Sequence, residues 1–206
     1  MQDIRIVPYF LEVYCGPMNS GKSKALIDRV DKLLYLEDIQ ICFFKPYLDT
    51  RGEKKIWSKF GGKSLDCTFI AENNPSEIFQ YVTDKTQVIV IDEVQFFCMD
   101  IVMVIEELQR IGKHIIVAGL DLDFRGENFG ALGEILARAD EVHKLKAICM
   151  VKGCNTTATR TQRLINGNPS SYYDPIILVG GQNEGYECRC LKHHEVLNKP
   201  TLNNHS

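Results

Sequence analysis

The feature that most constrains this chain is a glycine-containing motif that stands between an apolar run and a helical pattern. Residues 10–15 (FLEVYC) predict a buried strand, and residues 20–35 carry apolar side chains at helical spacing. The motif fits G-x-x-x-x-G-K-[ST] and consists of Gly16, Pro17, Met18, Asn19, Ser20, Gly21, Lys22 and Ser23. A strand, a glycine loop and a helix in this order predict a P-loop, which surrounds a phosphate with backbone N–H groups.

The residue types of the motif suit a nucleoside triphosphate. Gly16 and Gly21 let the backbone wrap closely, and Lys22 places a cation on the β and γ oxygens. The Ser23 hydroxyl can ligate Mg²⁺. The competing interpretation is a chance glycine-rich turn before a helix.

A second apolar run ends in two acids. Residues 88–91 (VIVI) predict a buried strand that is followed by Asp92 and Glu93. We expect Asp92 to hold Mg²⁺, commonly through water, and Glu93 to accept a proton from the attacking group. The alternative is that both acids only end a strand in solvent. The motifs leave the acceptor open between water and a small alcohol.

The order of the apolar runs predicts an α/β fold of the P-loop (RecA-like) class. Short runs rich in β-branched residues at 39–44, 88–91 and 114–118 alternate with helical patterns, one of which covers residues 101–108. This alternation favours a mostly parallel sheet with helices on both faces. Residues 50–64 are polar and show neither the helical nor the strand repeat of apolar side chains, so they predict a surface loop. Near residue 147 the alternation gives way to cysteines and turn residues, so a domain boundary is expected there.

Composition limits the function classes. The chain has 206 residues, 45% of them hydrophobic, which suits one domain or one domain with a small module. A net charge of −3 argues against a main affinity for nucleic acid or anionic lipid. No apolar stretch reaches the roughly 20 residues of a membrane span, and residues 1–10 lack the features of a secretory signal. A cytoplasmic protein that binds no membrane is expected.

The cysteines near the C-terminus indicate a metal site. Cys149 and Cys154 form C-x₄-C, and Cys190 and His193 form C-x₂-H, two spacings that can bring four ligands to one zinc ion. Four protein ligands make a structural rather than a catalytic Zn²⁺ site. Spacing alone does not decide whether the third ligand is Cys188 or Cys190, or whether the fourth ligand is His193 or His194. Free or buried cysteines without a metal are the alternative.

Taken together, the motifs resemble those of the type II thymidine kinases, over nearly the whole chain. The resemblance is carried by residues 16–23, Lys45-Pro46, residues 49–51, residues 92–97, Gly119-Leu120-Asp121, Phe124-Arg125, Phe129-Gly130, residues 158–163 and Tyr186. It implies that the γ-phosphate of ATP is transferred to the 5′-hydroxyl of thymidine or deoxyuridine in pyrimidine salvage. A kinase that prefers a purine nucleoside or deoxycytidine is the nearer rival, and a nucleotide-sensing module with a zinc ribbon is the more distant one.

The resemblance also implies residue roles around the triphosphate. Glu93 would be the general base for the 5′-hydroxyl, with Lys22 and Arg51 as the other catalytic residues. The remaining residues implied in binding ATP and Mg²⁺, besides the P-loop, are Asp49, Thr50, Asp92, Val94 and Gln95. For Asp49 and Arg51 the alternative is a surface ion pair after a proline turn.

A nucleoside pocket and its lid follow from the same comparison. The residues implied around thymidine are Met18, Leu120, Phe124, Phe129, Thr161, Ile176, Ile177, Leu178, Val179, Gly180 and Tyr186. Thr161 would lie near the 5-methyl group, and the backbone of residues 176–180 would read the base edge. Without the resemblance, Leu120 and the two phenylalanines would more often be core residues. Residues 159–185 would form a lasso that closes over the nucleoside.

The resemblance settles the remaining expectations. Counting from Tyr186 selects Cys190 and His193 as the third and fourth zinc ligands and leaves Cys188 as a spare thiol. The expected domains are 1–146 for nucleotide binding and 147–195 for the zinc-containing lasso, with residues 196–206 as a disordered tail. A homotetramer and feedback inhibition by dTTP are implied as well. The chain departs from the family pattern at Asn19, Val94 and Ser58-Lys59, and in the spacing of its first cysteine pair.

Overall fold

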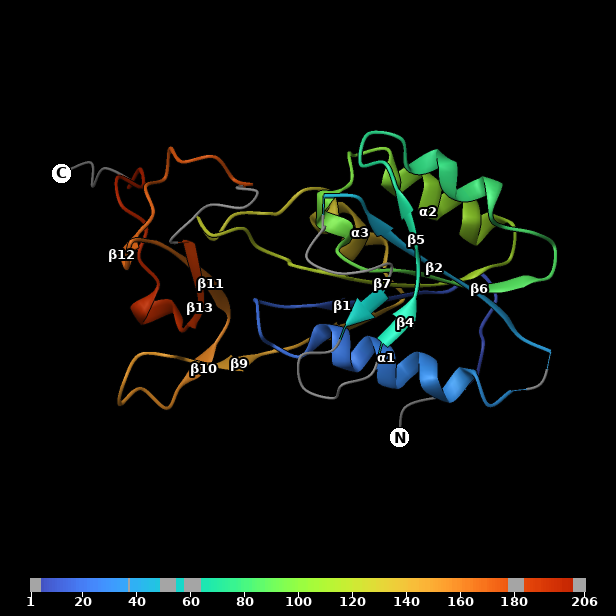
Figure 1. The fold of residues 1–206 in the computed structure, drawn as a ribbon, viewed down its shortest axis with the longest axis horizontal. Helices are drawn as coiled ribbons and strands as arrows, with labels where there is room; N and C mark the ends of the chain where they lie inside the picture. The colour runs from blue at the N-terminus through green and yellow to red at the C-terminus, as the bar shows by residue number, and fades with distance from the viewer. Residues whose placement is uncertain (1–4, 37, 49–54, 58–63, 178–183, 202–206) are drawn as a thin grey trace.

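The computed structural model describes residues 5–36, 38–48, 55–57, 64–177 and 184–201. Along the chain, a large sheet covered by helices is followed by small antiparallel sheets, which lie to one side of it (Figure 1). The large sheet ends with β8, and the antiparallel strands of the last part of the chain begin with β9 at Ala147. The predicted change of architecture near residue 147 therefore falls between these two strands.

The large sheet has six strands in the order β5-β2-β6-β7-β1-β8, and all of its pairings are parallel. Its strands are β1 (Leu11–Cys15), β2 (Gln40–Pro46), β5 (Thr68–Ile70), β6 (Thr86–Ile91), β7 (His114–Gly119) and β8 (Glu141–Lys144). Strands β1, β6 and β7 are almost entirely buried, as continuous apolar runs predict for a sheet covered on both faces. The predicted fold class is thus confirmed. The edge strand β8 was not predicted, because it is short and mostly exposed.

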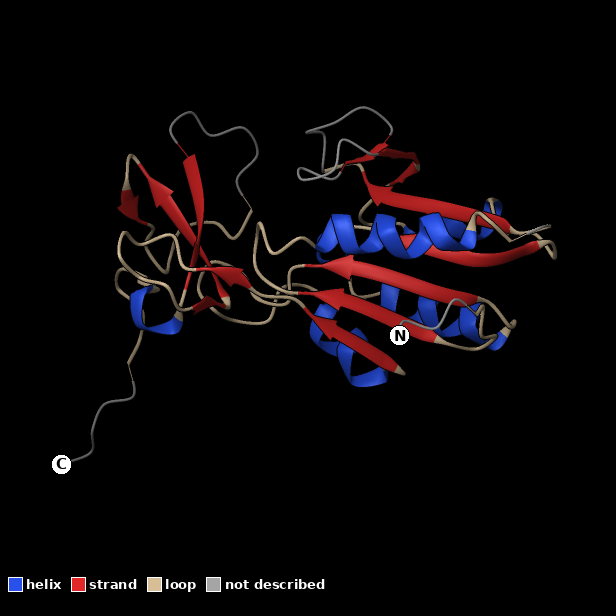
Figure 2. Cartoon of the chain, turned by 90° about the horizontal axis from the view of Figure 1, so that it is seen from below, coloured by secondary structure: helices blue, strands red, loops and turns tan. Residues whose placement is uncertain are grey.

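Helices cover both faces of this sheet (Figure 2). On one face, α1 (Lys22–Leu33) packs Leu26 and Val30 into a cluster with Val88 and Val90 of β6. On the other face, α2 (Ile101–Arg110) and α3 (Leu132–Arg138) share a cluster with residues 89 and 91 of the same strand. Side chains alternate between the faces of a strand, so β6 contributes to both clusters. Short 3₁₀ helices η1 (Pro75–Gln80) and η2 (Val94–Phe96) flank β6.

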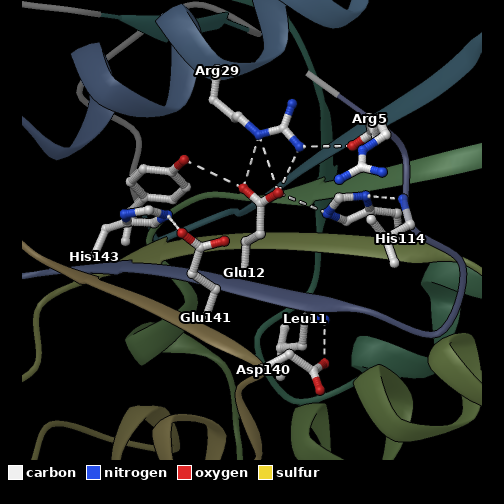
Figure 3. Close-up of polar contacts among 10 residues, drawn as sticks. Arg5, Leu11, Glu12, Arg29, His114, Asp140, Glu141 and His143 are labelled. Atoms are coloured by element: carbon white, nitrogen blue, oxygen red, sulfur yellow. Dashed lines mark hydrogen bonds and ion pairs between the residues drawn. The ribbon is translucent and has the colours of Figure 1, made fainter. Parts of the chain in front are cut away.

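One buried polar cluster interrupts the apolar contact between α1 and the sheet (Figure 3). Arg29 Nη2 of α1 lies 2.6 Å from Glu12 Oε1 of β1, and His114 Nε2 of β7 lies 3.0 Å from the same oxygen. All three residues are at most 4% exposed. A carboxylate this deeply buried requires such partners, because burial of an unpaired charge is costly.

The small sheets are antiparallel. The strands are β9 (Ala147–Ile148), β10 (Thr157–Ala158), β11 (Arg160–Ile165), β12 (Asn168–Pro169) and β13 (Glu184–Arg189), with η3 (Leu191–His193) after them. Strand β11 lies between β12 and β13, and β9 pairs with β10. The buried cluster of this part consists of three cysteines and one alanine, Cys149, Ala158, Cys188 and Cys190.

The segment predicted as a loop at residues 50–64 contains a strand. Strand β3 (Lys55–Trp57) pairs antiparallel with β4 (Ser64–Asp66). The loop prediction is wrong here because three paired residues are too few to show a period. Among the described residues, no helix is long and apolar enough to cross a membrane.

Candidate active site

The phosphate loop joins β1 to α1 as the sequence predicts. Gly16 has φ 141°, and a Cβ on it would lie 2.3 Å from the Leu145 carbonyl oxygen, so only glycine fits this close approach. Gly21 precedes α1 with φ 87°. The Ser20 hydroxyl is buried and has no hydrogen-bond partner within the described part of the chain. Tight backbone turns and an orphaned hydroxyl fit a loop that surrounds an anion.

Lys22 is folded back onto this loop. Its Nζ donates a hydrogen bond to the Pro17 carbonyl oxygen at 2.8 Å. Burial lowers the pKa of Lys22 below its ordinary value, while the carboxylates of Glu93, Asp92 and Asp121 act in the opposite direction. The cation of the loop therefore lies among three acids that come from other strands.

The two acids after β6 have different surroundings. Asp92 is 3% exposed, and its Oδ1 accepts the Glu93 N–H at 3.0 Å. Glu93 has φ 53°, a left-handed conformation that is uncommon for a residue with a side chain. Its Oε2 accepts a hydrogen bond of 2.6 Å from Gln95 Nε2. The chain thus turns sharply at Glu93, and Gln95 fixes one carboxylate oxygen.

Gln95 is buried and bridges two parts of the site. Its Oε1 accepts the Leu120 N–H at 3.1 Å, while its Nε2 donates to Glu93. The Gln95 side chain lies so close to the end of β7 that a Cβ on Gly119 would be 2.5 Å from Gln95 Oε1. The sequence assigned Gln95 to ATP and Mg²⁺ binding, whereas the structure places its amide between the carboxylate and the loop after β7. The neighbouring Val94 lies in the apolar core.

Asp121 is a site residue to which the sequence gave no role. It is 3% exposed, and its Oδ2 lies 2.9 Å from Lys144 Nζ. A signal was present in the sequence, because this acid follows the apolar run that becomes β7. Parallel strands end at the same edge of a sheet, and β7 lies beside β1, so an acid after β7 must approach the phosphate loop.

The predicted nucleoside residues come from three segments. Leu120, Phe124 and Phe129 lie in the loop after β7, Thr161 in β11 and Tyr186 in β13. Phe124 and Phe129 are buried, and Phe129 packs edge to face on Phe96 with ring centroids 5.5 Å apart. Ile176 and Ile177 are about two-fifths exposed, at 41% and 40%.

The structure brings Met18 of the phosphate loop to Thr161. The Met18 N–H donates to Thr161 Oγ1 at 3.0 Å. The predicted residues Asp49, Thr50 and Arg51, and Leu178, Val179 and Gly180, lie outside the described residues.

The four predicted zinc ligands come together. The sulfurs of Cys149, Cys154 and Cys190 and a ring nitrogen of His193 all lie within 4.8 Å of one another. His193 Nδ1 lies 3.6 Å from Cys149 Sγ and 3.3 Å from Cys190 Sγ. The distance between Cys154 Sγ and Cys190 Sγ is 4.0 Å. Zn–S bonds of about 2.3 Å at tetrahedral angles place ligand sulfurs about 3.8 Å apart, so this set fits the ion.

The two alternatives to these ligands have other partners. Cys188 Sγ donates to the Met18 carbonyl oxygen, and His194 Nε2 lies 2.8 Å from the Phe124 carbonyl oxygen. The Thr156 hydroxyl lowers the pKa of Cys190 to about 6, with help from the His193 backbone and the other two thiols. A thiol that ionises this readily is a good metal ligand.

Comparison with known proteins identifies the family of the chain. Residues 9–194 match the family profile described as thymidine kinase. A thymidine kinase of Coprothermobacter proteolyticus is 48% identical over 190 residues, which cover 92% of each chain. A thymidine kinase of Mycoplasma genitalium is 43% identical over 189 residues, which cover 91% of this chain and 84% of that protein. A match of this extent, on a chain whose phosphate loop, paired acids and cysteine cluster are all in place, shows that the chain belongs to the thymidine kinase family.

Proposed function

We propose that this protein transfers the γ-phosphate of ATP to the 5′-hydroxyl of thymidine or deoxyuridine, and so yields dTMP or dUMP and ADP. Membership of the thymidine kinase family supports the nucleoside, and a kinase of this family uses ATP. One structural observation carries the chemistry. The phosphate loop with Lys22 follows β1, and Asp92 and Glu93 follow β6. Both strands pair in parallel with β7, so the loop and the two acids lie at the same edge of the sheet.

ATP would bind with its phosphates in the loop of residues 16–23. Only glycine at position 16 allows the loop to lie this close to the Leu145 carbonyl oxygen, and the backbone N–H groups of the loop would bind the phosphate oxygens. Lys22 would exchange its bond to the Pro17 carbonyl for the β and γ oxygens. Ser20, whose buried hydroxyl lacks a partner among the described residues, would donate to a phosphate oxygen.

The residues around the loop also suit a divalent cation. Ser23 and Asp92 would hold Mg²⁺, which when bound neutralises charge on the transferring phosphate. The hydroxyl and the carboxylate are oxygen ligands, which this hard cation prefers. Asp49, Thr50 and Arg51 are proposed to complete this half of the site, with Arg51 at the transferring group.

Glu93 is proposed as the general base. Its carboxylate would take the proton of the 5′-hydroxyl as the oxygen attacks the γ-phosphorus and the bond from that phosphorus to ADP breaks. The amide of Gln95 holds one carboxylate oxygen at 2.6 Å, which limits the rotation of the side chain. Gln95 is therefore proposed as a residue that positions the base.

Selection of the base is assigned to the closing segment 159–185. Met18, Leu120, Phe124, Phe129 and Tyr186 would surround the ring and sugar, with Thr161 near the 5-methyl group. Main-chain groups of residues 176–180 would pair with N3–H and O4 of thymine. Cytosine reverses this donor and acceptor pattern, and each unpaired buried group would cost about 1–3 kcal/mol.

Zn²⁺ at Cys149, Cys154, Cys190 and His193 is proposed to have a structural role. The small part of the chain has few apolar residues in its buried cluster, so a metal would supply much of its stability. The domains 1–146 and 147–195, the homotetramer and feedback inhibition by dTTP belong to the same proposal.

An assay of the purified chain with ATP and four nucleosides tests this function. Thymidine and deoxyuridine should be phosphorylated, deoxycytidine poorly and deoxyguanosine not at all. Nucleoside monophosphate and ADP should form in equal amounts, which chromatography of the products measures. Equal kcat/KM for deoxycytidine and thymidine, or ADP release without a phosphorylated nucleoside, would overturn the proposal.

A further inference from the structure

Arg163 is the largest side chain that is fully buried in the described structure. It lies on β11, pairs in register with Tyr186 of β13 and has 0% exposure. Arginine is rarely buried, because its charge must leave water. The Asp174 carboxylate is 3.8 Å from Nη2, too far for a hydrogen bond, and its side chain is 32% exposed. Charge pairing alone therefore does not account for this arginine.

The side chain of Arg163 lies on the face of β11 and β13 that meets the phosphate loop. Alternate residues of a strand share a face, so Arg163 points to the same side as Thr161. Their register partners, Tyr186 and Cys188, point to that side as well. Thr161 and Cys188 both bond to Met18, which identifies this side.

Arg163 distributes its donors over one segment of the chain. Nε donates to Ser170 Oγ at 2.9 Å. Nη1 donates to the carbonyl oxygen of Pro175 at 2.6 Å and lies 3.4 Å from that of Ile176. These contacts hold both ends of the segment 170–176, and Ile176 is the first residue of the main chain that is proposed to read the base.

The same guanidinium lies over the ring of Phe124, a residue of the proposed pocket. Its Cζ is 3.6 Å from the centroid of the Phe124 ring, a close cation–π contact. One side chain therefore connects the ring of Phe124, which follows β7, with the segment that begins at Ser170. A lysine lacks the planar fork that such a connection needs, and an apolar residue would leave the buried Ser170 hydroxyl and the Pro175 carbonyl without their donor.

We propose that Arg163 is a positioning residue for the nucleoside half of the active site. It sets the distance between the Phe124 ring and the start of the base-reading main chain, and so determines how well a thymine ring fits between them. This inference rests on the proposed function, since it requires thymidine to lie between the Phe124 ring and the main chain at Ile176. It predicts that loss of the guanidinium weakens thymidine binding while ATP binding persists. Within the described part of the chain, its contacts go to residues 170–176 and to the Phe124 ring, and none goes to the phosphate loop.

Steady-state kinetics with both substrates varied test this role. Arg163→Met and Arg163→Lys should each raise KM for thymidine about 10–100-fold, with KM for ATP changed by less than about threefold. The matched control is Arg138→Met. Arg138 lies on α3, outside the proposed nucleoside pocket, and its side chain is 44% exposed and pairs with Glu134 one helical turn away. Its KM values should stay within about twofold of those of the original protein.

Two further variants keep the test decisive if these substitutions disturb folding, which zinc content and circular dichroism report. Ser170→Ala removes a single acceptor of the fork and should raise KM for thymidine about 3–10-fold. Arg163→Ala should recover thymidine affinity when methylguanidinium is added, but not when methylammonium is added, because only the former is a planar fork.

The proposal is overturned if the folded Arg163 and Ser170 variants keep KM for thymidine within about twofold, or if the KM values for ATP and thymidine rise together. In either case, normal thymidine kinase activity of the unmodified chain leaves the proposed function intact. Absence of that activity from the unmodified chain would instead refute the function.

Discussion

Thr161 and Cys188 face each other across β11 and β13, and both side chains hydrogen bond to the main chain of Met18. Thr161 Oγ1 accepts the Met18 N–H at 3.0 Å, and Cys188 Sγ donates to the Met18 carbonyl oxygen at 2.6 Å. Burial raises the pKa of Cys188, so its sulfur keeps the proton that it donates. The main chain of Met18 therefore joins the phosphate loop to the sheet of β11 and β13.

This relationship separates the roles of two neighbouring cysteines. Cys188→Ser should retain one zinc ion per chain, because the hydroxyl can still donate to Met18 and all four metal ligands remain. Cys190→Ser should lose the zinc, because a serine hydroxyl is a poor ligand at neutral pH. Elemental analysis of both purified variants measures the count. Loss of zinc from the Cys188 variant alone would show that the ligand assignment is wrong.

Replacement of Glu93 by glutamine tests the general base. Glu93→Gln keeps the size of the side chain and removes its basicity, so kcat for thymidine should fall about 10²–10⁴-fold. Affinity for ATP should change little, and calorimetric titration of the variant with ATP measures it. A variant with a kcat close to that of the unmodified chain would remove Glu93 from the proposed mechanism.

Gln95 should matter through Glu93. Gln95→Leu keeps the volume but removes the donor to Glu93 and the acceptor for the Leu120 N–H. We expect kcat to fall about 10-fold or more, because the base is then free to rotate. A Gln95→Glu variant should not recover the rate, since a carboxylate would repel Glu93. Unchanged kcat in the leucine variant would argue against the positioning role.

Lys22 should affect ATP binding and phosphate transfer together. Its charge would act on the phosphates in both the ground state and the transition state, so Lys22→Ala should raise KM for ATP and lower kcat. Lys24→Ala is the matched control, because Lys24 lies on the same helix but is exposed. Normal ATP affinity and turnover in the Lys22 variant would contradict the P-loop assignment.

Glu12 should make stability depend on pH in a defined direction. Burial raises the pKa of Glu12, but hydrogen bonds and charge from His114 and Arg29 outweigh this and lower it from 4.5 to about 2. A lowered folded-state pKa gives stability that is present above about pH 4.5 and is lost as the pH falls towards 2. Glu12→Gln should reduce the free energy of unfolding at neutral pH by about 3 kcal/mol.

Urea unfolding of the unmodified chain and of Glu12→Gln measures this effect. The difference in the free energy of unfolding should narrow by about 1 kcal/mol between pH 6 and about pH 3.5. Contributions of titrating groups that do not interact with Glu12, such as the cysteine cluster, cancel in this comparison. A difference that stays constant over the range would show that Glu12 titrates normally in the folded protein.

The motifs that the sequence identified are those in which neighbouring residues act together. The phosphate loop, the two acids after β6 and the buried strands are each contained in a few consecutive residues, so their patterns are visible without the fold. The parallel order of the sheet also followed, because strands that alternate with helices have few other arrangements. Strand β8 and the hairpin of β3 and β4 escaped notice, because they are short and their stability comes from pairing partners.

Contacts between segments far apart in the chain were decided only by the tertiary structure. Spacing left Cys188 and Cys190 equivalent, and a family resemblance was needed to choose between them. In the structure β13 ends at Arg189, so Cys188 stays on the face towards Met18 while Cys190 begins the turn to η3. The bridge made by Gln95 likewise depends on a distant partner, since Leu120 lies 25 residues further along the chain. The burial of Arg163 depends on the register of its strand. Sequence periodicity records which face of an element is buried, whereas the partner that meets a polar side chain on that face is set by how the elements pack.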